Sequence, residues 1–261
     1  MVILRIFNFS YYCTMSNKIS LKYIKSLQIK KYRQEAQSFC VEGLKSVLEL
    51  SHSPFEVSLI AGTHEFFEEY GSRLPDNAEH MVLGMKDLSR VSAFKSNNSA
   101  IAVAKMLPEE EFKLKGEWVI ALDEINDPGN FGTILRAADW YGIRKVVCSM
   151  QSVDLYNPKT LAASMGSFTR VRVYYKELQE FLNQQSVPVY GAFLNGKSIH
   201  EFEFGKEGIL LMGSESHGIR KDLKVDERLT IPSFGNAESL NVAMATAVML
   251  DNLSRSINTP S

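Results

Sequence analysis

Three stretches in the second half of the chain place glycine, asparagine, serine and acidic residues directly after an apolar run. Their sequences are L-D-E-I-N-D-P-G-N-F-G-T-I-L-R at 122–136, I-L-L-M-G-S-E-S-H-G-I at 209–219 and I-P-S-F-G-N-A-E-S-L-N at 231–241. Short apolar runs bounded by turn residues are typical of buried strands. Ligands bind at the carboxyl ends of strands in open α/β sheets. We therefore expect the three stretches to meet at one site.

The first stretch has the features of a helix start. D-P-G predicts a turn, and Asn130 can cap the helix that follows. Gly132 lacks a side chain, which lets another backbone or a ligand approach the positive end of the helix. Arg136 lies further along the same helix, and its planar guanidinium suits a phosphate. A capped helix with a surface arginine is the alternative.

The second stretch runs from an apolar strand into Gly213, and Glu215 follows two residues later. Its G-x-x-x-x-G spacing is similar to a phosphate-binding loop. However, Ile219 and Arg220 stand where that loop needs Lys and then Ser or Thr, which excludes ATP binding of this kind. A loop histidine is favoured over a catalytic base for His217.

The third stretch precedes the last predicted helix, at 240–253. Ser239 or a neighbour is expected to cap this helix, and Asn241 in its first turn needs a hydrogen-bond partner. Apolar residues occupy nearly every face of the helix, so protein must enclose it. A second subunit or a deep insertion would do so.

Alternating strand and helix patterns along the whole chain predict an α/β fold. In the first half we predict strands at 39–42, 56–61, 81–84 and 100–105, and helices at 18–28, 44–50, 64–70 and 87–94. In the second half we predict strands at 118–122, 145–148, 169–174, 189–193, 209–212 and 229–231, and helices at 130–141, 159–165 and 240–253. The charged stretch at 108–117 is predicted to link a domain at 15–107 to a domain at 118–261.

Composition excludes several classes of protein. The 261 residues are 45% hydrophobic and 23% charged, which is typical of a globular protein rather than a disordered or fibrous one. The three cysteines are far apart and the five histidines lack ligand spacing, so we predict a cytoplasmic protein without disulfides or a metal site. No apolar run approaches the roughly 20 residues that cross a membrane. Residues 1–14 lack signal-peptide features and precede Met15, and we predict an upstream extension there, with an N-terminal strand as the alternative.

Charge is distributed unevenly along the chain. Residues 1–34 carry seven basic and no acidic side chains, although the formal net charge of the whole chain is −1. A basic N-terminal segment on an otherwise mildly acidic chain indicates that a polyanion binds at this segment. A basic helix face that is only solvated is the alternative.

The three stretches resemble the three ordered motifs of the SpoU (TrmH-type) RNA ribose methyltransferases, which belong to the SPOUT superfamily. The matching patterns are N-x-G-x-x-x-R at 130–136, L-M-G-S-E-S-x-G at 211–218 and I-P-x-x-x-x-x-E-S-L-N at 231–241. Ser216 and His217 stand where Gly or Asn is more usual, which removes no functional position. L-Q-I-K-K-Y-R at 27–33 and F-C-V-E-G at 39–43 resemble the family's N-terminal RNA-binding domain, which is similar to certain ribosomal proteins.

The resemblance implies a C-terminal SPOUT domain with a trefoil knot, a smaller N-terminal α/β RNA-binding domain, a homodimer, and S-adenosylmethionine as cofactor. The implied reaction is methyl transfer to a ribose 2′-hydroxyl. By position, Gly213, Ile231 and Leu240 are expected to line the cofactor pocket. The residues expected around the reacting groups are Asn130, Arg136, Glu215, Ser239 and Asn241. Those expected to contact RNA are Lys22, Lys25, Lys30, Lys31, Arg33 and Arg136.

The resemblance favours structured ribosomal RNA over transfer RNA as substrate, because of the ribosomal-protein-like front domain. An antibiotic-resistance methylase would share the same motifs. A catalytically idle RNA-binding or ribosome-assembly protein on this scaffold is the alternative from a different class, and the five intact polar residues argue against it. A Ser-His hydrolase ranks last, since the chain has no nucleophile elbow.

Overall fold

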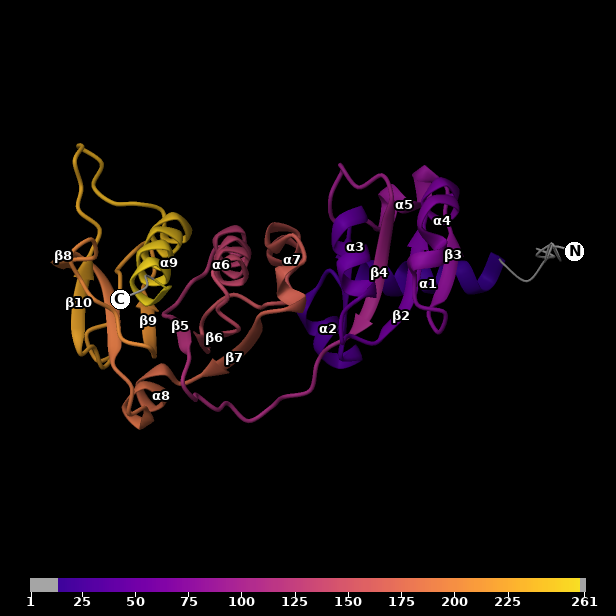
Figure 1. Ribbon diagram of the computed structural model, residues 1–261. Helices are drawn as coiled ribbons and strands as arrows, with labels where there is room; N and C mark the ends of the chain where they lie inside the picture. Colours follow the sequence, from indigo (N-terminus) through magenta and orange to yellow (C-terminus); the bar gives the residue numbers. More distant parts are fainter. Residues whose placement is uncertain (1–13, 259–261) are drawn as a thin grey trace, which may run out of the picture.

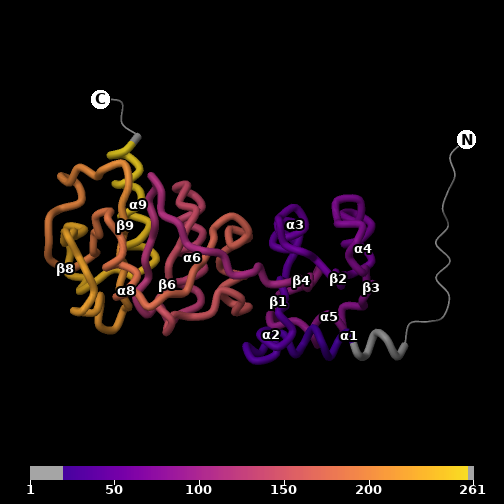
Figure 2. The backbone as a smooth tube through the Cα atoms, turned by 90° about the horizontal axis from the view of Figure 1, so that it is seen from below, coloured from indigo at the N-terminus to yellow at the C-terminus, as the bar shows by residue number. Residues whose placement is uncertain are grey.

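The computed structural model describes residues 14–258, arranged as two sheets with their helices, joined by an extended connection (Figure 1). Residues 1–13 and 259–261 lie outside it, and nearly all of the extension expected at 1–14 falls among them. Residues 106–117, between the last strand of the first sheet and the first strand of the second, contain no helix or strand. Figure 2 shows the same two halves from below, with the connection passing between them.

The N-terminal half alternates helices and strands. In chain order these are α1 (Thr14–Ser26), α2 (Lys30–Ala36), β1 (Ser38–Glu42), α3 (Leu44–Ser51), β2 (Val57–Gly62), α4 (His64–Tyr70), a 3₁₀ turn (Gly71–Arg73), β3 (Glu79–Val82), α5 (Met85–Val91) and β4 (Ala100–Lys105). The four strands form one sheet of order β1-β4-β2-β3. Because side chains alternate along a strand, Ile101 and Val103 of β4 pack beneath α1 and α5, whereas Ala102 and Ala104 face the side of α3 and α4.

The C-terminal half forms a six-stranded sheet in which every pair of neighbours is parallel. Its elements are β5 (Trp118–Leu122), α6 (Pro128–Trp140), β6 (Lys145–Ser149), α7 (Pro158–Ser164), a 3₁₀ turn (Ser167–Thr169), β7 (Arg172–Lys176), α8 (Leu178–Gln184), β8 (Val189–Ser198), β9 (Gly208–Met212), β10 (Glu227–Thr230) and α9 (Val242–Asn258). The strand order is β10-β8-β9-β5-β6-β7. The polar stretches after β5, β9 and β10 therefore emerge at the same edge of one sheet.

Helices cover both faces of this second sheet, with α6, α7 and α9 on one side and α8 on the other (Figure 1). In β5, Ile120 and Leu122 pack under the first group, and Val119 and Ala121 pack with α8. Strands that are buried on both faces are apolar at consecutive positions. That is why W-V-I-A-L and I-L-L-M predicted β5 and β9 so directly.

The two halves share one continuous apolar core. The Phe39 ring of β1 lies with its centroid 4.5 Å from that of Tyr156 and 6.1 Å from that of Phe168, both of the C-terminal half. Polar contacts cross the same boundary, where Arg33 binds Asp154 and Arg170 pairs with Glu49. The halves are thus packed against each other in addition to being joined by the connection.

The structure corrects several predicted elements. The strand predicted at 169–174 begins at Arg172, because Ser167–Thr169 forms a 3₁₀ turn. Helices α2 and α8 were not predicted. The last helix is not enclosed within one chain: α9 packs against α6, whereas Met244 on its outer side is 61% exposed. The alternative of a deep insertion is therefore wrong for a single copy, and the knot implied by the family resemblance stays a prediction.

Candidate functional site

Asp127 organises the first polar stretch, between β5 and α6. It lies at the N-cap of α6, where its Oδ1 accepts the backbone N–H of Asn130 at 2.8 Å, and Pro128 takes the first helical position. This hydrogen bond lowers the pKa of the Asp127 carboxyl below its usual value. The prediction that Asn130 caps the helix is wrong, since Asp127 supplies the acceptor. The Asn130 side chain is therefore available for contacts elsewhere.

Gly132 lets α6 approach another backbone, which is one of the two roles predicted for it. A Cβ at this position would lie 2.4 Å from the carbonyl oxygen of Thr160 and 2.9 Å from the backbone nitrogen of Ser164, both in α7. The close approach is therefore to helix α7, and it fixes how α6 presents its first turn.

The second polar stretch folds back on itself directly after β9. Ser214 and Gly218 exchange backbone hydrogen bonds of 3.2 and 2.9 Å, which close a tight loop. Gly218 has φ +70°, in the left-handed region that favours glycine. At Gly213 a Cβ would lie 2.2 Å from the carbonyl carbon of Gly218 and 2.2 Å from the nitrogen of Ile219. Only glycine fits at the point where the chain leaves the strand.

Asn241 connects the third polar stretch to the last helix. Its Oδ1 accepts the backbone N–H groups of Ala243 at 3.0 Å and Met244 at 3.4 Å, just where α9 begins. Asn241 thus fills the capping role that was predicted for Ser239 or a neighbour. Its side-chain nitrogen stays free of this cap and points to two other residues.

These residues form a closed cluster that unites the three stretches. The Asn241 Nδ2 donates to Asn130 Oδ1 at 2.9 Å and to Glu215 Oε1 at 3.1 Å, and Asn130 Nδ2 donates to the same Glu215 oxygen. The partner that the sequence required for Asn241 is therefore found, and two amides converge on one carboxylate. The cluster brings together groups that are 111 residues apart in sequence.

The other predicted site residues are not part of this cluster. Arg136 and Ser239 are both exposed, and within residues 14–258 neither side chain hydrogen-bonds to Asn130, Glu215 or Asn241. Gly213 and Leu240 each lie within two residues of a cluster member. Ile231 directly follows β10 and packs against the main core.

Comparisons with known proteins agree with this arrangement. The model of the SpoU rRNA Methylase family matches residues 117–251, which is more than half of the chain and includes all three stretches. This protein belongs to the SpoU methylase family. A second family model, the MRM3-like substrate binding domain, matches residues 18–102.

The SpoU assignment extends to individual relatives. The 23S rRNA (guanosine(2553)-2′-O)-methyltransferase RlmP of Bacillus subtilis is 33% identical over 239 residues, covering 88% of this chain and 93% of RlmP. A TrmH-family protein of Porphyromonas gingivalis has a solved structure with TM-score 0.80 and 37% identity, covering 90% of this chain and 96% of the other. The AdoMet-bound rRNA methyltransferase of Sinorhizobium meliloti has TM-score 0.82 and 26% identity, covering 95% of this chain and 97% of the other.

A hollow lies beside the cluster in this SpoU domain, and the sequence predicted only part of its lining. Its walls are Glu124, Ile125, Asn126, Asp127, Asn130, Ser214, Glu215, Ser216 and Val242. Glu124 and Asp127 were not predicted as site residues. The D-P dipeptide was a usable signal for Asp127, because proline at the first helical position places the cap one residue earlier. Among residues 14–258, no group of three or more His, Cys, Asp or Glu is arranged to hold a metal ion.

The basic residues of the N-terminal half divide into two groups. Lys22, Lys25, Lys30 and Lys31 are exposed on α1 and α2. Arg33 is buried, and its guanidinium donates to Asp154 Oδ2 at 2.7 Å and to the carbonyl oxygens of Leu27 and Gln28. The prediction that Arg33 contacts RNA is therefore wrong, since its donors face protein.

In the described part of this SpoU protein, no helix is both long and apolar enough to span a membrane.

Proposed function

We propose that this protein methylates a ribose 2′-hydroxyl in ribosomal RNA with S-adenosylmethionine as methyl donor. The observation that carries the proposal is the Asn130–Glu215–Asn241 cluster, in which all three SpoU motifs contribute a side chain. The similarity to RlmP and to the AdoMet-bound enzyme of Sinorhizobium meliloti supports the same substrate class and cofactor.

Glycine is required where the loop after β9 begins. A Cβ at Gly213 would collide with the backbone of Gly218 and Ile219, so the loop packs closely on itself there. Gly213, Ile231 and Leu240 would hold the cofactor, largely through backbone groups. When bound, S-adenosylmethionine supplies a methyl group activated by its positively charged sulfur.

Arg136 is proposed to act on the RNA side of the reaction. A guanidinium stays protonated at neutral pH, so it is a poor general base. It is well suited to bind the phosphate beside the target ribose and to stabilise negative charge that develops on the attacking oxygen. Asn130, Glu215 and Asn241 would orient the reacting groups, and Ser239 precedes Asn241 by two residues in the third motif.

The four exposed lysines of α1 and α2 are the proposed RNA contacts of the N-terminal half. Phosphate contacts make RNA affinity depend on salt, because each contact releases counterions. Structured RNA is recognised largely by its shape and its unpaired loops, so we expect these lysines to position the RNA and not to read its sequence.

We also propose a homodimer that acts in the cytoplasm. Helices α6 and α9 each leave a large apolar side chain exposed: Trp140 at the end of α6 is 82% exposed, and Met244 near the start of α9 is 61% exposed. A second copy that covers Met244 would complete the enclosure that the apolar pattern of α9 predicts. Light scattering should give twice the mass of the chain, and a monomer would contradict the dimer.

Methyl transfer tests the proposed function. Ribose methylation is mapped in total RNA from a strain that lacks the gene, and we expect one missing mark in ribosomal RNA. The purified protein should restore that mark with S-adenosylmethionine. A mark missing from transfer RNA would redirect the substrate assignment, and binding of RNA without cofactor binding would favour the idle alternative.

Arg136→Lys tests the role of the guanidinium, with Arg144→Lys as the matched control. Arg144 is an exposed arginine that precedes β6, at the opposite end of the strand from the site. We expect Arg136→Lys to lower turnover by about 100-fold, the magnitude typical of one lost hydrogen-bond donor, because lysine keeps the charge but lacks the second prong of the guanidinium. Near-normal turnover of Arg136→Lys would contradict the planar, two-pronged contact with phosphate.

A further inference from the structure

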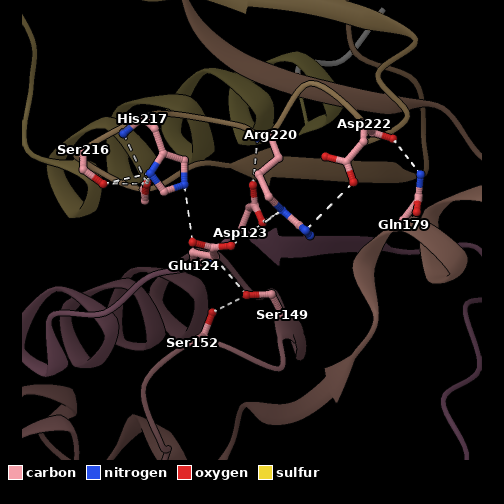
Figure 3. A network of polar contacts seen from close by, with 10 residues as sticks. Asp123, Glu124, Ser149, Ser152, Gln179, Ser216, His217, Arg220 and Asp222 are labelled. Carbon is pink, nitrogen blue, oxygen red and sulfur yellow. Dashed lines mark hydrogen bonds and ion pairs between the residues drawn. The ribbon is translucent and has the colours of Figure 1, made fainter.

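An ion pair with a buried carboxylate joins Arg220, the residue after the second polar stretch, to the end of β5 (Figure 3). Asp123 directly follows β5 and is fully buried. One of its carboxylate oxygens accepts the backbone N–H of Arg220 at 2.9 Å, and the other accepts Arg220 Nε at 2.9 Å. A single carboxylate therefore fixes both the main chain and the side chain of Arg220.

The backbone of Asp123 adds a third connection to the same region. Its N–H donates to the carbonyl oxygen of Met212 at 2.9 Å, which continues the pairing of β5 with β9 by one residue. Asp123 thus holds the chain on both sides of the loop at 213–219. Met212 is the last residue before the loop, and Arg220 is the first residue after it.

Glu124 makes a second, weaker tie between the same segments (Figure 3). It has φ +55°, a left-handed conformation that few residues other than glycine adopt. Its backbone N–H donates to Ser149 Oγ at 2.9 Å, which holds this turn against β6. Its carboxylate lies 3.4 Å from His217 Nε2 and 3.8 Å from Arg220 Nε.

The loop between the two anchored ends has little freedom of its own. The mutual hydrogen bonds of Ser214 and Gly218 close the loop. The absence of a Cβ at Gly213 lets the first residue of the loop pack against the backbone of its last two residues. Glu215 projects from this loop to Asn130 and Asn241. A rotation of the loop about its exit at Arg220 would therefore withdraw the Glu215 carboxylate from both amides.

We infer that Asp123 and Arg220 are a positioning pair for the proposed methyl transfer: they hold the 213–219 loop so that Glu215 meets the cluster and the Gly213 backbone faces the cofactor. Buried ion pairs contribute little net stability compared with apolar residues of the same size. What this pair supplies is a defined geometry, because the two bonds to one carboxylate permit a single placement of residue 220. The inference rests on the proposed function for its catalytic meaning.

Asp123→Asn and Arg220→Lys test the inference. Asparagine keeps one oxygen to accept the Arg220 N–H but removes the charge, and lysine keeps the charge without the Nε donor. Calorimetry measures the affinity for S-adenosylmethionine, and kinetics separate kcat from KM. For both variants we expect cofactor affinity to fall about tenfold and kcat to fall as well, with RNA affinity within twofold of the wild type.

Asp222→Asn is the matched control. Asp222 also faces Arg220, at 3.9 Å from Nη1, but its side chain is half exposed and it makes no hydrogen bond to the Arg220 backbone. It should leave cofactor affinity and kcat within twofold. Equal effects of Asp123→Asn and Asp222→Asn would overturn the inference, because general charge around Arg220 would then explain both.

Hydrogen exchange separates this inference from the proposed function. The amides of 213–219 should exchange at least tenfold faster in Asp123→Asn, with no change in Asp222→Asn, whether or not RNA is methylated. Unchanged exchange in Asp123→Asn would refute the positioning role. If the wild-type protein does not methylate RNA, the proposed function is refuted but the positioning role is not. If Asp123→Asn fails to fold, Arg220→Lys carries the same comparison.

Discussion

Arg33 gives the sharpest contrast between an RNA contact and a structural role. Its side chain is 3% exposed and that of its partner Asp154 is 17% exposed, so the pair is largely shielded from water. Arg33→Met removes the bond to Asp154 together with two bonds to backbone carbonyls, and it leaves a carboxylate without its cation. Breaking a buried pair in this way costs about 3–5 kcal/mol.

Methionine refills part of the space, and the guanidinium Nε already lacks a partner, so we expect a loss near the lower end, about 3 kcal/mol. Urea unfolding should show this as a midpoint lower by about 1 M. Adding Asp154→Asn to Arg33→Met should restore at least about 1 kcal/mol, because neighbouring changes in one ion pair are not additive.

RNA binding completes the test. The folded Arg33→Met protein should bind ribosomal RNA within twofold of the wild type, whereas Lys30→Ala should weaken binding and reduce its salt dependence by about one phosphate contact. The reasoning would be refuted if Arg33→Met left the urea midpoint unchanged and lowered RNA affinity as much as Lys30→Ala.

Three further predictions follow from single residues. Gly213→Ala should abolish measurable binding of S-adenosylmethionine in calorimetry, because its Cβ would overlap the Gly218 backbone; retained affinity would contradict the close approach. Asp127→Ala should cost about 1 kcal/mol through the lost helix cap. Since folding lowers the pKa of Asp127, urea unfolding should show this difference in full above about pH 5 and show it shrink as the pH falls through about 4 and below; a difference that grew in acid would contradict the cap. Burial raises the pKa of the Cys40 and Cys148 thiols, so a Cys13→Ser protein should react with a thiol reagent at pH 8 only after denaturant is added, and rapid native labelling would be the contrary result.

The sequence predicted most strands because their burial leaves a direct record. β5 and β9 are covered on both faces and therefore read as unbroken apolar runs. Helix α8 was missed although Leu178, Phe181 and Leu182 have helical spacing, because a helix of under two turns offers few positions to establish a period.

The site was predicted in composition better than in detail. The convergence of Asn130, Glu215 and Asn241 was expected from the three stretches. The cap of α6 lies three residues before the predicted Asn130, at Asp127, and the cap of α9 lies two residues after Ser239, at Asn241. Arg33 was misassigned because its partner Asp154 is 121 residues away. A basic residue among lysines looks the same in sequence whether it faces water or a distant carboxylate.

The two uses of the Asn241 amide couple the folding of the last helix to the formation of the site. Its oxygen caps α9 and its nitrogen binds Asn130 and Glu215, so fraying at the start of α9 would also disrupt the cluster. During synthesis the reaction centre can assemble only after residues 242–258 have left the ribosome and docked. A shortened chain that still contained every motif residue would accordingly be inactive.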